Sequence, residues 1–267
     1  MKLPFKTLET RRLGRTEMRP KAVGLGCAHF GGDLSTDPDA VDAIRRAIEL
    51  GIDYVDTSPL YGESERRVGL ALEGGWREKV YLQTKMGTHA QRWHDYTAAG
   101  TRWCVENSLR LLKTDYLDAV LIHDPPAIEI PLEPGYALDE LCRMKEAGIV
   151  RHVGLGVRQH DFHQKAIETG RVEIVLSYMD YTLLSRTVAE TTLPLAKKHD
   201  SVSYWPARWR VDSWPDRSLP IRRRTRCGSG VGKMASNSRI LRFNMCLPHP
   251  STALPCRDLA TAAKLKK

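Results

Sequence analysis

Between residues 22 and 196 the chain alternates short apolar runs with amphipathic stretches of helical period. The apolar runs lie at 23–27, 52–56, 80–85, 116–123, 151–156 and 172–178. Runs this short and this apolar are typical of parallel strands that are buried on both faces. The alternation therefore predicts repeated βαβ units around a parallel sheet.

The stretches between these runs carry the start and stop signals of helices. In the first stretch, Asp37 can accept hydrogen bonds from free N–H groups, Pro38 fits the first turn, and Gly51 can end the helix. Further helices are expected at 63–73, 100–112, 138–148, 159–169 and 186–199. Six strand-helix units favour an α/β fold of the (β/α)8 TIM-barrel type over an open sheet, with a small hairpin ahead of the first strand.

The positive charge of the chain is concentrated in its C-terminal segment. The net charge is +9, yet residues 1–200 carry 27 Lys and Arg against 29 Asp and Glu, whereas residues 201–267 carry 14 against 3. A basic fold would suggest a nucleic-acid partner. Here the first 200 residues have the balanced charge of an ordinary soluble enzyme.

Composition also bears on location, on metal chemistry and on the type of nucleotide site. No apolar run approaches the ~20 residues of a membrane span, and the segment MKLPFKTLETRR lacks a signal-peptide core, so we expect a cytoplasmic protein without a membrane partner. The six cysteines have neither metal-ligand spacing nor disulfide density, so we expect reduced thiols and no metal. The glycine pairs at 24–26 and 154–156 lack the third glycine of a Rossmann fingerprint.

Polar side chains follow three consecutive strand-like runs at the point where each run ends. Asp56 ends the second run, Lys85 the third and His123 the fourth, and Tyr61 lies in the loop after Asp56. In a (β/α)8 barrel the carboxyl ends of the strands meet at one mouth, where active sites lie. We therefore expect these four side chains to converge.

This combination of groups suits proton donation to a carbonyl oxygen. A phenol with a pKa near ~10 is a poor acid at neutral pH, but an adjacent ammonium stabilises the phenolate and lowers that pKa. Asp56 would hold Lys85 charged and in place, while His123 would orient the carbonyl or share its proton. Each residue alone has a structural explanation, and only their order and combination favour an active site. Such a site would need a hydride cofactor.

The motifs around these residues resemble one known family. The string DTSPLYGESERRVGLAL, residues 56–72, resembles the Asp-Thr-Ala/Ser-x-x-Tyr-Gly-x-Ser-Glu signature of the aldo-keto reductases, which are TIM-barrel enzymes. LQTKMG, DYLDAVLIHDP and GIVRHVGLGV are similar to the family's lysine strand, histidine strand and fifth-strand segment, and the resemblance covers about residues 10–199. The Ser-Pro-Leu-Tyr-Gly form resembles most the branch of threo-aldose and galactose dehydrogenases.

This resemblance implies a reaction and a set of catalytic residues. The reaction would be reversible hydride transfer between a nicotinamide cofactor and an aldehyde, a ketone or a sugar lactol. The cofactor would be NADPH, with NAD as the alternative. The catalytic residues would be Asp56, Tyr61, Lys85 and His123, with Tyr61 as the proton donor. The sequence identifies neither the substrate nor the oligomeric state.

The resemblance also implies cofactor contacts, some of them with substitutions. Where the family has Ser-Asn after the fifth strand and Gln on the sixth, this chain has Gly156, Val157 and Tyr178. Backbone groups or Arg158 would then hold the nicotinamide amide, and Asp56 would contact the cofactor as well.

The phosphate end of the cofactor would lie near the C-terminus. In the loop after the eighth strand, Arg257 matches the arginine that contacts the adenosine 2′-phosphate in the family. Cys256 stands beside it where a glycine would help the backbone approach phosphate. Arg257 is therefore predicted as a cofactor contact in an altered loop.

From Ser201 onward the sequence departs from the family pattern. A run with tryptophans at 205, 209 and 214 and arginines at 222, 223, 224 and 226 replaces the expected seventh strand. Codons for residues 202–213 can be chosen so that the frame one nucleotide later reads Ser-Val-Ile-Gly-Pro-Leu-Ala-Gly-Gly-Trp-Thr, which resembles the missing strand. We hypothesise a reading-frame change near Ser201, which sequencing of the gene tests.

The chain is therefore divided into three parts. Residues 1–200 are predicted to form the barrel, residues 201–239 an irregular basic segment, and residues 240–267 the remnant of the last βα unit. A parallel barrel without its seventh strand would have open edges on the sixth and eighth strands. Two alternative functions remain: a catalytically impaired barrel that no longer binds cofactor, and nucleic-acid binding through the Arg/Trp-rich segment.

Overall fold

The computed structural model describes residues 9–32, 36–181, 185–206 and 245–248, and for 202–206 and 245–248 it describes the backbone. Eight strands form a closed barrel in the spatial order β1-β10-β9-β8-β7-β6-β3-β2. Their bounds are β1 (Gly24–Gly26), β2 (Tyr54–Asp56), β3 (Tyr81–Met86), β6 (Leu117–His123), β7 (Val150–Gly156), β8 (Ile174–Leu176), β9 (Val202–Pro206) and β10 (Met245–Pro248). A separate antiparallel hairpin consists of β4 (Thr88–His89) and β5 (Arg92–Trp93).

The six strands predicted from the sequence are β1, β2, β3, β6, β7 and β8, and each is parallel to the next. The prediction of a parallel, barrel-type sheet is thus confirmed. The sheet is irregular after the sixth of these strands, as expected, because β10 runs antiparallel to both of its neighbours.

The expectation of open edges is wrong for this structure. Within the segment that we predicted to be irregular, β9 pairs in parallel with β8, in the place of the seventh barrel strand. β10 then pairs with β9 on one side and with β1 on the other. Closure removes the exposed backbone N–H and C=O groups that an edge strand would present.

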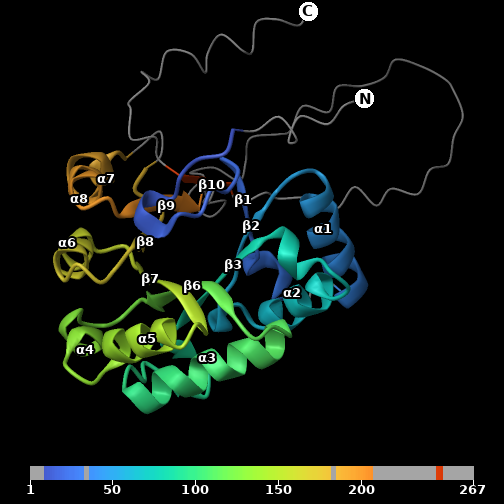
Figure 1. Ribbon diagram of the computed structural model, residues 1–267, viewed down its shortest axis with the longest axis horizontal. Coiled ribbons are helices and arrows are strands. Elements are labelled where there is room, and N and C mark those ends of the chain that lie inside the picture. Colours follow the sequence, from blue (N-terminus) through green and yellow to red (C-terminus); the bar gives the residue numbers. More distant parts are fainter. Residues whose placement is uncertain (1–8, 33–35, 182–184, 207–244, 249–267) are drawn as a thin grey trace, which may run out of the picture.

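Helices surround the strands in chain order, from α1 beside β2 to α7 and α8 beside β9 (Figure 1). Their bounds are α1 (Asp37–Glu49), α2 (Ser64–Leu72), α3 (Ala98–Leu112), α4 (Glu129–Leu132), α5 (Ala137–Glu146), α6 (His160–Glu168), α7 (Thr187–Glu190) and α8 (Thr192–Lys198). Short 3-10 turns are η2 (Gly14–Thr16), η3 (Ala28–Phe30), η4 (Pro59–Tyr61) and η5 (Arg77–Lys79). Among the described residues, no helix covers the outer side of β10.

Two helices differ in detail from the sequence prediction. The N-cap of α1 is Thr36, whose hydroxyl accepts from the Asp39 N–H, whereas the predicted cap Asp37 lies in the first turn and pairs with arginines of α2. The helix expected at 186–199 is broken at Thr191 into α7 and α8. Pro194 explains the break, because it has no N–H and its ring would collide with the carbonyl of residue 190 in a continuous helix.

The hydrophobic core consists of two parts. A large cluster fills the space between the strands and the helices, with Val55, Leu82 and Val120 on the strands and Ile44 and Leu141 on the helices. A smaller cluster fills the barrel interior, with the members Leu13, Met18, Tyr54, Ala119, Leu121, Ile174 and Leu176. Since buried strands contribute side chains to both parts, the alternation along each strand divides the two cores.

The predicted N-terminal hairpin is present and closes one end of the barrel. The Leu13 N–H donates to the Met18 carbonyl at 2.9 Å, and Thr10 pairs antiparallel with Lys21. Both Leu13 and Met18 belong to the interior cluster. The amino end of the barrel is therefore sealed, and the carboxyl end of the strands is left for the site.

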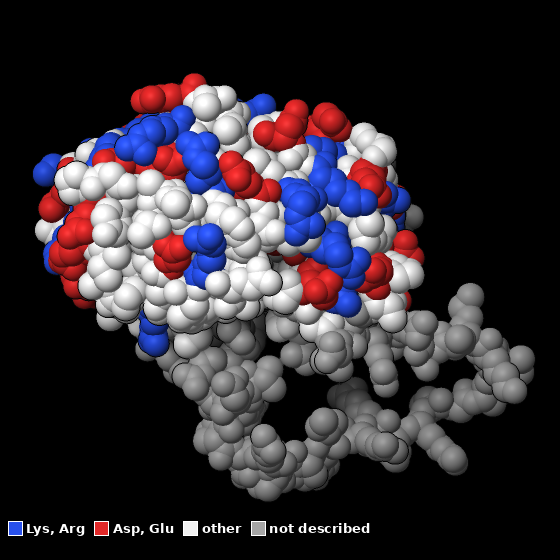
Figure 2. All heavy atoms as spheres, turned by 90° about the horizontal axis from the view of Figure 1, so that it is seen from below, with Lys and Arg blue, Asp and Glu red and all other residues white. Residues whose placement is uncertain are grey.

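The surface of the barrel carries charges of both signs. Figure 2 shows Lys and Arg side chains interspersed with Asp and Glu over the face that it presents. Exposed side chains of the described residues also form ion pairs, including Arg46 with Glu49 at 2.8 Å and Arg12 with Asp200 at 2.6 Å. This face has no field of a single sign. No helix in the described part of the chain is long and apolar enough to cross a membrane.

Candidate active site

Asp56 and Lys85 form a buried ion pair at the carboxyl ends of two neighbouring strands. The Lys85 Nζ donates to Asp56 Oδ1 at 2.7 Å and to the Thr57 carbonyl at 2.8 Å. Gln83 Nε2 donates to the same carboxylate oxygen at 2.6 Å, and the Tyr54 hydroxyl donates to Gln83 Oε1 at 2.7 Å. A buried charge needs such partners, and here both the ammonium and the carboxylate have them.

The surroundings of Lys85 keep its side chain protonated. Only 1% of the residue is exposed, and burial alone would lower the pKa of the ammonium. Coulombic and hydrogen-bonding interactions with Asp56 and Tyr61 outweigh burial and raise that pKa above its ordinary value. Lys85 is therefore a fixed positive charge at the mouth of the barrel.

Tyr61 ends the 3-10 turn η4, which follows directly from the strand end at Asp56. Ser58 caps this turn by accepting the Leu60 N–H at 3.1 Å, and Pro59 occupies its first position. A Cβ on Gly31 would lie 1.5 Å from the Tyr61 carbonyl oxygen, and a Cβ on Gly62 would lie 2.5 Å from the Gly31 carbonyl oxygen. The two glycines allow the loop after β1 to press against the backbone at Tyr61 and fix its position.

His123 ends β6 and is held by its neighbours on several sides. Its Nδ1 lies 2.8 Å from Thr88 Oγ1, its carbonyl accepts the Tyr96 hydroxyl at 2.6 Å, and its Nε2 lies 3.5 Å from Asp124 Oδ2. Burial, and then the positive charge of Lys85, lower the pKa of His123 well below its ordinary value. The imidazole is therefore neutral at physiological pH.

The Tyr61 ring lies close to both the lysine and the histidine. Lys85 Nζ is 4.8 Å from the centre of the Tyr61 ring, and the Tyr61 and His123 ring centres are 6.4 Å apart with an edge-to-face angle of 85°. The structure thus brings together the four side chains that the sequence selected. A phenol beside a fixed ammonium and a neutral imidazole can donate a proton to an oxygen atom and can stabilise the resulting phenolate.

The residues selected as cofactor contacts are distributed around the same mouth. Gly156 ends β7 beside His123, and its carbonyl accepts the Asp124 N–H at 3.0 Å. Tyr178 follows β8, and its hydroxyl donates to Asp124 Oδ1 at 3.3 Å. Burial raises the pKa of the Tyr178 phenol to about 12, and the nearby charge of Arg158 opposes that rise. Asp56 is buried beneath Lys85, with 4% of the residue exposed. Arg257, the remaining predicted contact, lies outside the described residues.

Three of the six described non-glycine residues with a positive φ angle lie in connections that follow the carboxyl ends of barrel strands. His94, Asp124 and Met179 have positive φ angles of 57°, 42° and 65°. His94 directly follows β5 of the hairpin, Asp124 directly follows β6, and Met179 lies after β8. Such conformations are costly for residues other than glycine, so the surrounding structure has to hold these three residues in place.

Several residues that complete the site were missed from the sequence. Gln83 and Tyr54 extend the hydrogen-bond network behind Asp56, Thr88 binds His123, and Asp124 lies between His123 and Tyr178. Gln83 had a usable signal, because it precedes Lys85 by two residues in a strand and so faces the same side. Asp124 had one also, since it directly follows a strand end. Thr88 had none, because its contact depends on a hairpin outside the repeating pattern.

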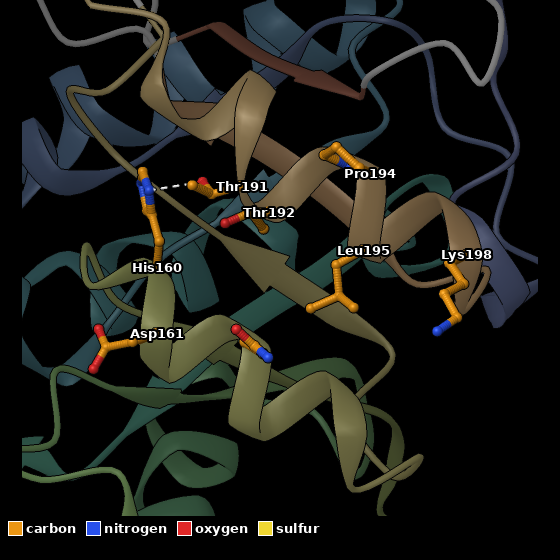
Figure 3. A pocket seen from close by; sticks show the side chains of 8 residues that line it. His160, Asp161, Thr191, Thr192, Pro194, Leu195 and Lys198 are labelled. Carbon is orange, nitrogen blue, oxygen red and sulfur yellow. Dashed lines mark hydrogen bonds between the residues drawn. The ribbon is translucent and has the colours of Figure 1, made fainter.

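A pocket of about 500 Å³ lies elsewhere, between α6 and α8 (Figure 3). Its lining consists of His160, Asp161, Gln164, Thr191, Thr192, Pro194, Leu195 and Lys198. His160 Nδ1 lies 2.8 Å from Thr191 Oγ1, and its Nε2 lies 2.5 Å from Asp180 Oδ2, so its ring is held by the structure. The pocket contains none of the four converging residues and belongs to the helix layer. We therefore place the candidate site at the mouth.

Three cysteines have side chains that the structure describes. Cys27 and Cys104 are buried, Cys142 is half-buried, and all three are free thiols. Burial raises the pKa of Cys104 to about 12, which keeps it protonated and unreactive. Within the described residues, no group of three or more His, Cys, Asp or Glu side chains lies where it could hold a metal ion.

Comparison with known proteins gives one consistent result. Residues 22–206 match the model of the aldo/keto reductase family. The chain is 30% identical over 200 residues to an L-galactose dehydrogenase of Arabidopsis thaliana. The alignment covers 71% of this chain and 62% of the plant protein. It is 26% identical over 200 residues to a D-threo-aldose 1-dehydrogenase of a Pseudomonas species, covering 65% of this chain and 61% of that protein. The chain thus spans less than two thirds of the length of these relatives.

A solved structure supports the same result at the level of the fold. The structure is an aldo-keto reductase of Klebsiella pneumoniae in complex with NADPH, which superposes with a TM-score of 0.62 at 27% identity. The superposition covers 74% of this chain and 66% of that one.

Proposed function

The chain belongs to the aldo/keto reductase family, and we propose that it catalyses NAD(P)H-dependent reduction of an aldehyde or ketone, or oxidation of a sugar lactol. Tyr61 would act as the proton donor in reduction. The observation that carries this proposal is the convergence of Tyr61, Lys85 and His123 over the buried Asp56.

The proton transfer follows from the charges of these residues. In reduction, the Tyr61 hydroxyl would donate its proton to the carbonyl oxygen as negative charge develops there. Lys85 stabilises the phenolate that remains, and Asp56 holds Lys85 in position through the 2.7 Å contact. In lactol oxidation, the same phenolate would accept a proton from the substrate hydroxyl, by microscopic reversibility.

Neutral His123 has a different role from Tyr61 in this scheme. A protonated imidazole would place a second positive charge beside Lys85, and the lowered pKa of His123 prevents this. The neutral ring can form a hydrogen bond to the carbonyl oxygen and orient it toward Tyr61. His123 would thus position the substrate rather than supply the proton.

The residues around the mouth fit a nicotinamide ring. Gly156 has no side chain beside His123, so its backbone is free to approach a planar ligand, and the partly buried Tyr178 offers a phenol ring and hydroxyl nearby. Arg158 supplies an exposed positive charge on the same side. These residues and Asp56 would hold the nicotinamide end, and Arg257 the 2′-phosphate. Bound there, the nicotinamide supplies the hydride in reduction and accepts it in oxidation.

NADP(H) is proposed as the cofactor, with NAD as the alternative. The NADPH complex of the Klebsiella pneumoniae protein supports this choice. The names of the two dehydrogenases support small sugars as one substrate class. The cytoplasmic location stays a prediction.

The nucleic-acid alternative rests on residues 201–239, most of which lie outside the described residues. The mixed charge of the face in Figure 2 gives it no support. A salt-dependent oligonucleotide titration tests it, because a phosphate-binding segment would bind at low ionic strength and release as salt rises.

One preparation suffices to test the proposed function. NADPH binding is measured by fluorescence, and carbonyl-dependent NADPH oxidation is then measured on the same sample with a panel of aldehydes and ketones. We expect saturable binding and turnover. Absence of binding would leave the family assignment in place, remove the enzyme function for this chain, and favour the impaired-barrel alternative.

A further inference from the structure

The four large hydrophobic side chains that are exposed among the described residues all lie in the connections that follow the carboxyl ends of barrel strands. They are Leu60, Trp93, Ile130 and Tyr181, in the connections after β2, β3, β6 and β8. Single exposed hydrophobic residues are ordinary on a protein surface, but their restriction to one set of loops is informative. Trp93 is the largest and the most exposed of them, at 54%.

The pairing of the β4–β5 hairpin determines the direction of the Trp93 side chain. Trp93 lies directly opposite Thr88, and His89 lies directly opposite Arg92. Residues directly opposite in an antiparallel pair project from the same face of the ladder. Because Thr88 faces His123, with 2.8 Å between Thr88 Oγ1 and His123 Nδ1, Trp93 also projects from the face turned toward the active site.

The opposite face of the hairpin packs against α3. His89 contacts the Trp103 ring edge to face at 4.8 Å between ring centres, and the Arg92 guanidinium lies 5.1 Å from the Trp103 ring. His89 Nε2 also lies 3.3 Å from Asn107 Nδ2. This anchoring explains why the indole of Trp93 can stay exposed while the hairpin that carries it is fixed.

A stack of aromatic rings connects Trp93 to the catalytic histidine. The Trp93 and His94 rings are stacked at 4.8 Å, and the His94 and Tyr96 rings at 6.0 Å. The buried Tyr96 donates its hydroxyl to the His123 carbonyl at 2.6 Å. The stack therefore rises from His123 to an exposed indole, and the strained φ of 57° at His94 is part of its construction.

From this arrangement, and on the premise of the proposed function, we propose that Trp93 determines substrate specificity by stacking on the face of a cyclic sugar while its anomeric carbon lies at Tyr61. An exposed indole offers a flat apolar surface that matches the C–H face of such a ring. The indole touches the part of the substrate that does not react.

Polar groups beside the stack select a sugar over an aromatic aldehyde. Asp124 and Tyr178 lie next to His123, and the Asp124 side chain is 35% exposed. Binding of an aromatic aldehyde would displace water from the Asp124 carboxylate, and the aldehyde ring cannot replace the hydrogen bonds that the carboxylate made to that water. This desolvation is unfavourable. The hydroxyl groups of a sugar can donate to the carboxylate, so they compensate for the lost water.

The kinetic test uses three variants, Trp93→Ala, Trp93→Phe and the control Trp103→Phe. Each is assayed for oxidation of galactose with NADP⁺ and for reduction of propanal, which has no ring for the indole to stack on, with NADPH. Trp93→Ala should lower kcat/KM for galactose about tenfold, mainly through KM, and change propanal by less than about twofold. Trp93→Phe should restore most of the loss. Trp103→Phe should alter neither reaction, because it keeps an aromatic ring against His89 and Arg92 and so preserves the anchoring of the hairpin.

Unchanged galactose kinetics in Trp93→Ala, or an equal loss with both substrates, overturns the proposal. A wild-type protein that turns over 4-nitrobenzaldehyde but not galactose overturns the assignment to sugars. Absence of all turnover instead counts against the proposed function. The binding of galactose, measured calorimetrically with and without NADPH, then decides the role of Trp93: binding weakened in Trp93→Ala and retained in Trp103→Phe supports it, and no binding to the wild type overturns it.

Discussion

Tyr61 owes its position to two residues that have no side chain. Gly31 and Gly62 allow two loops to meet backbone against backbone, and a Cβ on Gly31 would lie 1.5 Å from the Tyr61 carbonyl oxygen. The atoms that a Cβ on either glycine would meet are backbone atoms of the other loop, and none belongs to Asp56 or Lys85. The backbone of Tyr61, the proposed proton donor, is therefore placed by this contact between the two loops.

Substitution at Gly31 should displace Tyr61 without abolishing the fold. In Gly31→Ala the clash is with backbone, so the turn at Tyr61 has to move, and we expect kcat to fall by about a hundredfold, the effect of a shift of roughly 1 Å. Gly32→Ala is the matched control, because a Cβ there meets nothing within 4 Å. Steady-state kinetics and thermal unfolding of both variants make the check; equal kcat in the two would refute this role of Gly31.

At the scale of elements, the region of α6 to α8 is held by buried histidine contacts. His163 Nε2 lies 2.8 Å from the Val157 carbonyl oxygen, and its Nδ1 lies 2.8 Å from Thr192 Oγ1. Burial lowers the pKa of His163 from 6.5 to about 4. The ring is therefore neutral in the folded protein at pH values where it would be protonated in the unfolded chain.

This difference predicts how stability depends on pH. Because the folded-state pKa is lowered, the contribution of His163 is fully present above pH 6.5 and is lost as pH falls toward about 4. The loss in unfolding free energy across that window is on the order of 3 kcal/mol. We expect His163→Gln to unfold with a shallower dependence on pH between 6.5 and 4, as measured by denaturant titration; an unchanged slope would refute the assignment.

Elements and converging side chains differed in how well they could be predicted. The six parallel strands followed from short apolar runs, and Asp56, Lys85 and His123 followed from strand ends. The break of the helix at Thr191 could have been predicted from Pro194 in the sequence. The capping of α1 by Thr36 and the contact of Thr88 with His123 were not, because each depends on a local competition or a long-range contact that the repeating pattern does not contain.

At the scale of the whole molecule, the barrel is closed by a strand of unusual direction. β10 is antiparallel to β1 and to β9, whereas the other neighbouring barrel strands are parallel. The direction of a strand depends on the path of the chain that leads to it, and residues 207–244 lie outside the described residues. The family match ends at residue 206, and the reading-frame hypothesis near Ser201 stays a prediction.

Removal of this closing strand should weaken the barrel. In a chain that ends at residue 244, β1 and β9 lose their shared neighbour and each presents unpaired backbone groups. We expect a lower thermal midpoint and association that increases with protein concentration, measured by circular dichroism and light scattering. A truncated chain that keeps the midpoint and stays dispersed would indicate that β10 contributes nothing to the barrel.

The central claim concerns the whole site, and the Tyr61→Phe variant tests it most directly. Pre-steady-state oxidation of NADPH is measured with a saturating carbonyl substrate, beside an equilibrium titration of NADPH. The phenol ring is kept and its proton removed, so the account predicts unchanged NADPH binding and a rate of reduction lower by about a hundredfold to ten-thousandfold. A variant that binds NADPH and reduces the carbonyl at the wild-type rate would contradict the assignment of Tyr61 as the proton donor.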